Sequence, residues 1–510
     1  MNQLLPLFVV IPLSATFLIM ILGRFIKDFN KYFASLVILL LVVMSFYSLM
    51  NLNGNVSLYK VGGWQPVNKI PIGIYMMMDG FNALIVCIIN LMGFLAVFYS
   101  ISYIKRYTAE NYYYALFCLL IGGMNGVVLS GDLFNIFVFL EISVISSYAL
   151  VAFGVEKNEL EASFKYQILG GLASFLILFG IGFIYWKTKT LNIADIKAAF
   201  SDGYDKRFYL FAQLLILSGF GLKAAIMPFH AWLPDAHSSA PSPISAMLSG
   251  VFIKAVGIYV IIRLFFNMFV INEGTSIVIT TLGTISMVIG VFLAIGQWDI
   301  KRLLAYHSIS QMGYVVMSVG IGMILVSRGL KPEVASLAIT GGIFHLINHA
   351  AFKGLLFLNA GAIEYTIGTR DLKEMGGLAK NMPVTSATSF VASMSISGIP
   401  PFNGFFSKLI IIIAAVMARF YLLAALAVIV SIITLASFLK FQRYAFYDKP
   451  DFKRKIKEVP FPMIFSMVVL SIICLLLSLL VFPSVREAVL GPAVDILTDP
   501  LKYSTTILGQ

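Results

Sequence analysis

Five ionisable side chains stand inside stretches of sequence that are otherwise apolar. They are one acid and four bases: Glu141, Lys223, Lys254, Lys353 and Lys408. Each such residue costs roughly 2.5 to 3.5 kcal/mol at the centre of a membrane helix, so it must face a polar partner or water rather than lipid. Groups of this kind predict proton transfer. The structural alternative is that each lysine only stabilises the fold, either by hydrogen bonds to carbonyls at a helix break or by extending its amine toward the membrane surface.

One predicted helix carries a polar stripe. His345, His349 and Lys353 are spaced four residues apart, which places them on one helix face, with Asn348 beside them. Histidine titrates near neutrality and can both donate and accept a proton. A single buried histidine is most often a core residue with its hydrogen bonds satisfied. Two histidines on the same helix face as a lysine instead favour a hydrated path for proton transfer.

Two further histidines lie in the segment MPFHAWLPDAHSSAPSPISA. His230 is a further candidate for proton transfer, whereas His237 is expected to cap a helix or to form a local hydrogen bond. A metal site is the competing explanation for His345 and His349. That explanation is disfavoured because no acid lies on their face and HEXXH is absent, so no metal ligands are predicted.

Prolines interrupt two of the predicted spans beside a lysine. LFAQLLILSGFGLKAAIMPFHAWLP contains Pro228 five residues after Lys223, and SFVASMSISGIPPFNGFFSKLIIIIAAV contains Pro400 and Pro401 before Lys408. A proline lacks an N–H and clashes with the carbonyl four residues earlier. The carbonyls expected to be freed are those of Ala224, Ile396 and Ser397, which at membrane depth must be satisfied by protein or water.

The elements that must position these residues are membrane-spanning helices. The chain has 510 residues, of which 59% are hydrophobic and 12% charged, and its apolar runs predict an all-α polytopic bundle of about fourteen spans. The runs are continuous rather than alternating, which excludes β-barrel patterning. Residues 4–22 are expected to remain as a span rather than a cleaved signal peptide, because their basic residues follow the apolar run.

The two interrupted spans, the seventh and the twelfth, lie five spans apart. This spacing predicts two five-helix repeats of inverted topology, as in many secondary transporters. The expected divisions are residues 1–110 for helices 1–3, 111–266 for the first repeat, 267–446 for the second, and 447–510 for the last helix and tail.

Charge distribution predicts the orientation of the chain. More of the 36 lysines and arginines fall on the side that receives the loop after the first span, including the rich loop from Lys440 to Lys457. By the positive-inside rule that side is cytoplasmic, and both termini face outward. The net charge of +12 is spread over short loops, which indicates orientation and anionic lipid rather than nucleic acid.

Cofactor chemistry is not indicated by any motif. Cys87, Cys118 and Cys474 are far apart, and no CxxC, haem or iron–sulfur spacing occurs. GxGxxG and Walker motifs are also absent. The sequence therefore predicts no cofactor and no electron transfer through this chain.

The long motifs LKAAIMPFHAWLPDAHSSAPSPISAMLSGVFIKAVGIY, GDLFNIFVFLEIS and GIPPFNGFFSK resemble a known family. It comprises the antiporter-like subunits of respiratory complex I, Mrp-type sodium/proton antiporters and membrane-bound hydrogenases. The resemblance covers roughly residues 70–445. It implies a subunit of a multi-subunit ion-pumping complex in a prokaryotic cell membrane. The short segment after the last span resembles medium-sized members such as the D-type Mrp protein and its hydrogenase counterpart.

The resemblance also implies a lateral polar axis. A glutamate in the fifth helix pairs with a lysine in the broken seventh, and the axis continues through the eighth, eleventh and twelfth helices. The matching residues are Glu141, Lys223, Lys254, His345, His349 and Lys408. At about 4 Å and an effective dielectric constant near 20, a carboxylate stabilises an ammonium by roughly 4 kcal/mol. The separation of Glu141 and Lys223 is therefore expected to control how firmly the lysine holds its proton.

The expected function is proton translocation along this axis, driven by redox chemistry or an ion gradient elsewhere in the complex. Three alternatives stay open: a sodium/proton antiporter that itself holds sodium at the freed carbonyls with Glu141, a solute symporter, and a passive scaffold. The identity of the complex, its redox substrate and the direction of transport are not readable from the residues.

Overall fold

The computed structural model describes residues 2–52, 54–64, 73–201, 203, 205–448, 456–499, 503 and 507. Part of the predicted basic loop, residues 449–455, therefore lies outside the described residues. The bundle is nearly all helical, with a single described hairpin of two antiparallel strands, β1 (Ser57–Lys60) and β2 (Tyr75–Met78), in which Ser57 pairs with Met78. The all-α membrane architecture predicted from the sequence is confirmed.

The helices of the first half are α1 (Leu7–Leu22), α2 (Phe29–Asn51), α3 (Gly80–Tyr103), α4 (Glu110–Leu129), α5 (Leu133–Val151), α6 (Lys157–Thr188), α7 (Ile193–Ser201), α8 (Lys206–Lys223), α9 (Trp232–Ser239), α10 (Ser242–Met247), the π-helical η4 (Leu248–Phe252) and η5 (Lys254–Ile258), and α11 (Tyr259–Asn267). Short 3-10 turns are η1 (Asn2–Leu4), η2 (Val61–Gly63) and η3 (Ile104–Arg106).

The helices of the second half are α12 (Glu273–Ile295), α13 (Ile300–Ser327), α14 (Pro332–Ile367), α15 (Leu378–Asn381), α16 (Pro383–Ser397), α17 (Asn403–Met417), α18 (Tyr421–Gln442), α19 (Phe461–Leu476) and α20 (Pro483–Thr498). Shorter turns are η6 (Leu372–Glu374), the π-helical η7 (Arg443–Tyr447) and η8 (Leu477–Val481).

Among the described residues, 12 helical segments are long and apolar enough to cross a membrane. The other two predicted spans are the interrupted ones, and each is divided as the prolines predict. Helix α8 ends at Lys223 and α9 begins at Trp232, with Pro228 between them. Helix α16 ends at Ser397 and α17 begins at Asn403, with Pro400 and Pro401 between them.

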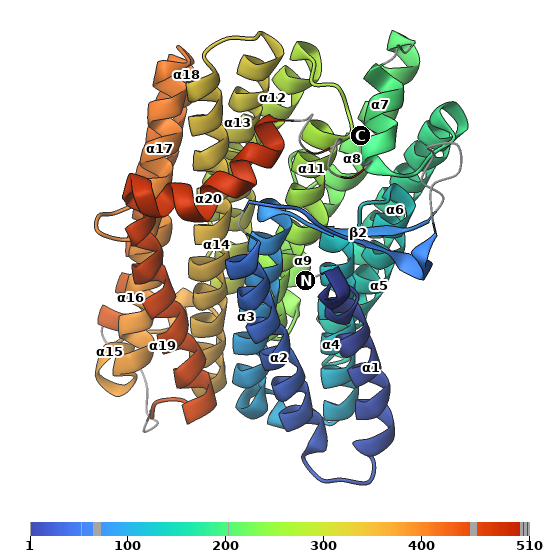
Figure 1. Ribbon diagram of the computed structural model, residues 1–510. Helices are drawn as coiled ribbons and strands as arrows, with labels where there is room; N and C mark the ends of the chain where they lie inside the picture. The colour runs from blue at the N-terminus through green and yellow to red at the C-terminus, as the bar shows by residue number, and fades with distance from the viewer. Residues whose placement is uncertain are drawn as a thin grey trace.

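The connections gather on two faces of the bundle. The first face carries residues 23–28, 104–109, 152–156, 296–299 and 368–382, where Asp299 and Asp371 form a β-bridge. The second face carries the hairpin and residues 130–132 and 189–192, joined by the bridges Met76–Ser130 and Asp132–Asn192. In Figure 1 the hairpin and α20 run across the direction of the other helices.

A buried ion pair ties α3 to α11. Arg263 lies 2.8 Å from Asp79, and both side chains are almost fully buried. Asp79 also caps α3 by accepting from the backbone N–H groups of Phe81 and Asn82, which satisfies donors that the helix leaves free. Asn267, one turn after Arg263, accepts from its guanidinium and donates to the Ile496 carbonyl in α20. One buried guanidinium therefore links α3, α11 and α20.

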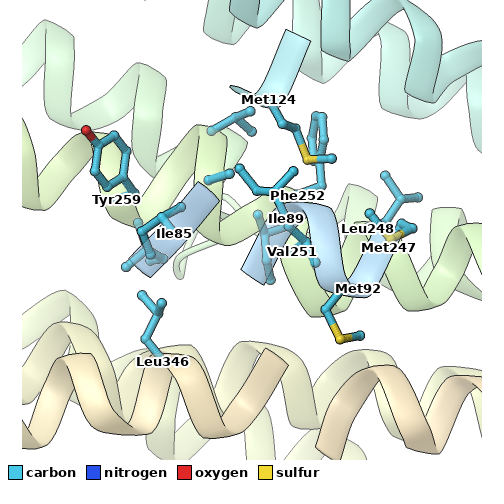
Figure 2. Close-up of a cluster of buried hydrophobic side chains, with 14 of the residues drawn as sticks. Ile85, Ile89, Met92, Met124, Met247, Leu248, Val251, Phe252, Tyr259 and Leu346 are labelled. Atoms are coloured by element: carbon cyan, nitrogen blue, oxygen red, sulfur yellow. The ribbon is translucent and has the colours of Figure 1, made fainter. Parts of the chain in front are cut away.

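Apolar side chains of the core pack around the π-helical segment η4. Figure 2 shows Ile85, Ile89 and Met92 of α3 gathered with Leu248, Val251 and Phe252 of η4, while Leu346 of α14 points toward the α3 side chains. These side chains are buried. Packing of this kind fixes η4, which shortly precedes the segment that carries Lys254, between α3 and α14.

The break after α8 packs tightly against η5. A Cβ added to Gly257 would lie 2.6 Å from the Cβ of Ala224 and 2.7 Å from its Cα. Real Cβ atoms do not approach this closely, so the glycine permits the contact between the two irregular segments.

We expect Gly257→Ala to destabilise the protein by about 1–3 kcal/mol, the range for overpacked sites. The measurement is the unfolding temperature of the purified protein in detergent. Gly182→Ala is the matched control, because Gly182 lies in α6 with nothing within 4 Å of an added Cβ. That change should leave the unfolding temperature equal or higher, since alanine favours helix by about 1 kcal/mol. Equal unfolding temperatures for Gly257→Ala and the wild-type protein would contradict the close approach.

Candidate functional site

Glu141, Ser174 and Lys223 form a cluster at the end of α8. Lys223 Nζ lies 4.0 Å from Glu141 Oε1. Ser174 of α6 stands between them: its hydroxyl donates to Glu141 Oε1 at 2.5 Å, and Lys223 Nζ donates to Ser174 Oγ at 3.0 Å. The amine also donates to the Gly170 carbonyl at 2.9 Å. The acid and the base are thus joined through a hydroxyl group that can relay a proton.

The two partners differ in exposure. The Lys223 side chain is 1% exposed, whereas that of Glu141 is 30% exposed on the outer side of α5. Phe134, Val138 and Ile145 on the same helix are also exposed. Glu141 therefore lies at the outer edge of the helix bundle.

Lys254 lies in the π-helical segment. Its Nζ donates to the Ser249 carbonyl at 2.6 Å. Ser249 in turn pairs through its hydroxyl with Ser308 of α13 at 2.6 Å. A π-helical turn leaves accessible some backbone groups that would be hydrogen-bonded in a regular α-helix. Such turns occur frequently at functional sites. The irregular backbone supplies the partner that this buried amine needs.

The predicted polar stripe lies on α14 and is fully buried. His349 and Lys353 have 0% exposure, and neither ring nitrogen of His349 nor the Lys353 amine has a hydrogen-bond partner among the described protein groups. Lys353 Nζ lies 5.6 Å from the centre of the Phe357 ring, and the charges of Lys254 and Lys353 both act on His349. Buried polar groups of this kind are commonly bridged by ordered water.

His345 connects the stripe to the second broken helix. Its Nδ1 pairs with Ser407 Oγ at 2.9 Å and its Nε2 with Gln311 Oε1 at 3.1 Å. Lys408, next to Ser407, donates to the Ile396 carbonyl at 2.7 Å. Ile396 is one of the carbonyls that the prolines were predicted to free.

The other freed carbonyl of this break is also satisfied. Ser397 O accepts from the hydroxyl of Ser431 in α18 at 3.1 Å, and Ser431 Oγ accepts from Lys408 at 3.1 Å. Both carbonyls therefore take side-chain donors, as the proline geometry requires.

The site residues form two groups. Glu141 and Lys223 make the first, and Lys254, His349, Lys353, His345 and Lys408 make the second. Within the described chain no direct hydrogen bond between their side chains joins the two groups; the contact of Ala224 with Gly257 brings their backbones together. His230 stands apart, with its half-buried ring beside the carbonyl of Pro228 at 3.3 Å.

The expectation for His237 is wrong. Rather than forming a local bond, its ring is fully buried and neither nitrogen has a hydrogen-bond partner among the described protein groups. It lies 5.2 Å from the Phe357 ring, measured between ring centres. Lys353, Lys254 and Lys301 act on it electrostatically. Treating the segment as a loop misses this, because residues 232–239 form α9, the second part of the divided seventh span.

Other polar residues of the site were not singled out from the sequence. His307 of α13 is buried, and its Nε2 pairs with Ser437 Oγ at 2.8 Å. His307, Gln311 and Tyr314 are spaced by four and three residues, so a stripe was readable on this helix as well. Ser174 gave no such signal, because its role depends on two partners from other helices. In the described part of the chain, no group of three acids, histidines or cysteines is placed to hold a metal.

Comparison with known families finds a match over the core of the chain. Residues 130–434 match the family model described as NADH:quinone oxidoreductase/Mrp antiporter, TM. The chain is 34% identical to the D-type protein of the Na(+)/H(+) antiporter of Alkalihalophilus pseudofirmus, over 88% of each chain. It is 32% identical to the N-type protein of the NADH-quinone oxidoreductase of Desulforudis audaxviator, over 85% of this chain and 84% of that one.

Solved structures give the same result. A chain of the Mrp complex from Dietzia sp. superposes with a TM-score of 0.89 at 29% identity, covering 100% of this chain and 99% of that one. A chain of the membrane-bound sulfane sulfur reductase, described as an archaeal respiratory membrane complex, also gives a TM-score of 0.89, at 28% identity, covering 99% of this chain and 100% of that one.

We expect Lys353→Met to raise the unfolding temperature of the purified protein in detergent. Methionine keeps the side-chain length but removes a buried amine without a hydrogen-bond partner, a group that costs about 1–3 kcal/mol. Lys440→Met is the matched control and should lower the unfolding temperature, because Lys440 Nζ bonds the carbonyls of Ile295 and Gln297 at the end of α12. A loss of stability in both variants would mean that Lys353 stabilises the fold.

Proposed function

The chain belongs to the membrane-subunit family of NADH:quinone oxidoreductases and Mrp antiporters, and we propose that it moves protons across the membrane along its buried polar row. It is an antiporter-like subunit of the Mrp and complex I type. The single observation that carries the proposal is the row itself, in which Lys353 and His349 are buried without hydrogen-bond partners among the described protein groups. An ionisable side chain is costly inside a membrane helix, so one that lacks a stabilising hydrogen bond is by default a candidate for function in transport.

The proposed transfer begins at the first group of residues. The carboxylate of Glu141, 4.0 Å from the Lys223 amine, favours the protonated lysine. When the two move apart, this attraction falls and Lys223 releases its proton. Ser174 holds both partners, so its hydroxyl sets the geometry from which the pair separates.

The proton then passes to the second group. In this scheme Lys254 takes it from Lys223 across the contact between Gly257 and Ala224, through water, and passes it to the α14 stripe. His349 and Lys353 carry it along that stripe. His345 delivers it to Lys408 through Ser407, with which it pairs at 2.9 Å.

Lys408 is the proposed outlet. Its amine is held by the Ile396 carbonyl and Ser431 at the point where α16 and α17 separate, so movement of either helix would free it. In this scheme Lys408 opens toward the face opposite to the one from which the proton enters. We also assign His230, beside the first break, to the proton-transfer residues, as the side chain that exchanges protons with water at that break.

A partner subunit is proposed to cover Glu141. The homologous chains of known structure belong to multi-subunit complexes, and a carboxylate 30% exposed at the middle of α5 would cost roughly 2.5 to 3.5 kcal/mol against lipid. A neighbouring subunit that offers a cation or hydroxyl groups to this face removes the cost. It also provides the contact through which chemistry in another subunit acts on the Glu141–Lys223 pair.

The remaining parts of the proposal concern arrangement. We place the first face in the cytoplasm and both termini outside, because the basic residues favour that orientation. We treat residues 111–266 and 267–446 as inverted repeats, since each contains one divided helix with a buried lysine beside the break. The redox or ion-driven step is assigned to other subunits, and this chain is proposed to bind no cofactor.

A sodium/proton antiporter that itself binds sodium is the second candidate, favoured by the names of related proteins. Such a site would need free oxygen ligands. The carbonyls of Ile396 and Ser397 already accept hydrogen bonds from Lys408 and Ser431. The second break therefore provides few free oxygen ligands for a sodium ion unless these hydrogen bonds break. The geometry supports protons better.

We expect Lys223→Ala and Glu141→Ala each to abolish proton transport by the assembled complex without preventing assembly. The measurement is acidification of sealed membrane vesicles, followed with a pH-sensitive dye, in buffers with and without sodium. Lys187→Ala and Glu333→Ala are the matched controls, because both side chains are exposed at helix ends. Unchanged transport in the two site variants would overturn the proposal, and transport that requires sodium would favour the second candidate.

We expect Lys408→Arg to reduce proton transport strongly while the complex still assembles. Arginine keeps the positive charge but does not release its proton at accessible pH. The same vesicle measurement tests this, with Lys440→Arg as a control at a lysine outside the row, whose amine donates to the carbonyls of Ile295 and Gln297. Normal transport in Lys408→Arg would exclude Lys408 as a proton carrier.

A further inference from the structure

A polar cavity of about 850 Å³ opens on the first face. Its walls come from the connections before α4, before α6, after α9, before α13 and after α14. The charged side chains around it include Arg106, Glu159, Asp299, Lys301, Glu364, Arg370 and Asp371. None of these residues belongs to the row described above. The cavity nevertheless reaches the end of α14, the helix that carries the row.

Glu364 lies at the inner end of the cavity. Its carboxylate is 2.9 Å from Lys301 Nζ and 3.9 Å from Arg370 Nε, and the side chain is 20% exposed. The Ser242 hydroxyl donates to the same carboxylate at 3.3 Å, and that of Tyr103 at 3.5 Å. This acid is therefore partly wet and partly held by buried donors, the arrangement of a group at the boundary between water and protein.

Lys301 joins the carboxylate to the segment that contains His237. The buried amine of Lys301 donates to the Ala240 carbonyl at 3.1 Å while it pairs with Glu364. Ala240 lies three residues after His237, just beyond the end of α9. The charge of Lys301 also acts on the His237 ring. Lys301 thus joins Glu364 to the backbone three residues after a buried histidine.

His237 lies beside the row. Both of its ring nitrogens lack a hydrogen-bond partner among the described protein groups. Its ring and the Lys353 amine lie against the same Phe357 side chain, at 5.2 Å and 5.6 Å from the ring centre. Lys353, Phe357 and Glu364 follow at intervals of four and seven residues, so all three lie on one face of α14. The α14 stripe therefore continues past Phe357 to the cavity.

We propose that this cavity is the mouth through which protons pass between water on the first face and the buried row, with Glu364 as the surface acceptor and His237 as the relay to Lys353. The proposal rests on the proposed function, which gives an order of transfer but no route between the water of the first face and the α14 stripe. The carboxylate of Glu364 takes a proton from water and passes it through water to one nitrogen of His237. The imidazolium releases the proton on its other nitrogen to the Lys353 amine, and Glu364 returns to its charged form. The sequence is reversible.

The first test is obstruction of the mouth. Ser239 lines the cavity, and Ser239→Cys is nearly isosteric. The native cysteines Cys87, Cys118 and Cys474 are buried, so a bulky membrane-impermeant maleimide should react with the new thiol alone. Applied to the first face of vesicles containing the assembled complex, it should lower the transport rate at least about tenfold, whereas the same label on Lys380→Cys, exposed on that face outside the cavity, should not. Complete labelling of Ser239→Cys with full transport would overturn the proposal.

The second test is substitution of the relay residues. Glu364→Gln and His237→Phe should each lower the transport rate at least about tenfold, since a missing proton carrier commonly costs a hundredfold or more, and Glu364→Asp should restore part of the rate. Glu333→Gln, at the other end of α14, is the control. Full transport in Glu364→Gln and His237→Phe, while Lys223→Ala remains inactive, would reject the mouth and keep the proposed function. Full transport in Lys223→Ala would instead reject the proposed function.

Discussion

An ammonium group inside a membrane protein requires a carbonyl oxygen that its own helix is not using. In a regular helix every interior carbonyl accepts from the N–H four residues later, so a buried lysine finds an acceptor only where the backbone departs from that pattern or where a neighbouring helix offers one. Lys408 uses Ile396 beside the divided α16 and α17, Lys254 uses Ser249 in the π-helical segment, and Lys301 uses Ala240 between α9 and α10. The irregularities of this fold therefore coincide with its buried amines.

Lys223 uses the Gly170 carbonyl inside the uninterrupted α6, whereas Lys353 has no acceptor among the described protein groups. Helix α14 runs without interruption from Pro332 to Ile367, so it frees no carbonyl for this amine. Its neighbours on the same face are His349 and Phe357, one without a hydrogen-bond partner in the described structure and the other apolar. No described protein acceptor holds this amine in its charged form, which is what the proposed proton transfer requires. The straightness of α14 is thus as relevant to the site as the breaks in its neighbours.

Much of the fold and part of the site could be read from the sequence. Pro228, Pro400 and Pro401 predicted both interruptions, and the spacing of His345, His349 and Lys353 predicted the buried face of α14. The π-helical segment around Lys254 was not readable, because it contains no proline and the apolar contacts of the preceding η4 with α3 and α14 (Figure 2) come from distant parts of the sequence. Ser174 was missed for a related reason: its importance lies in two partners from other helices, which a single sequence does not pair.

The Asp79–Arg263 pair has a consequence for how the chain is made. The two residues are separated by 184 positions, and ribosomes add about 5–20 residues per second. The beginning of α3 is therefore in the membrane for roughly ten to forty seconds before its cation is synthesised. During that interval Asp79 is satisfied only by the N–H groups that it caps and by water. Closure of this end of the bundle is consequently a late event of biogenesis, completed when α11 arrives and α20 can dock on Asn267.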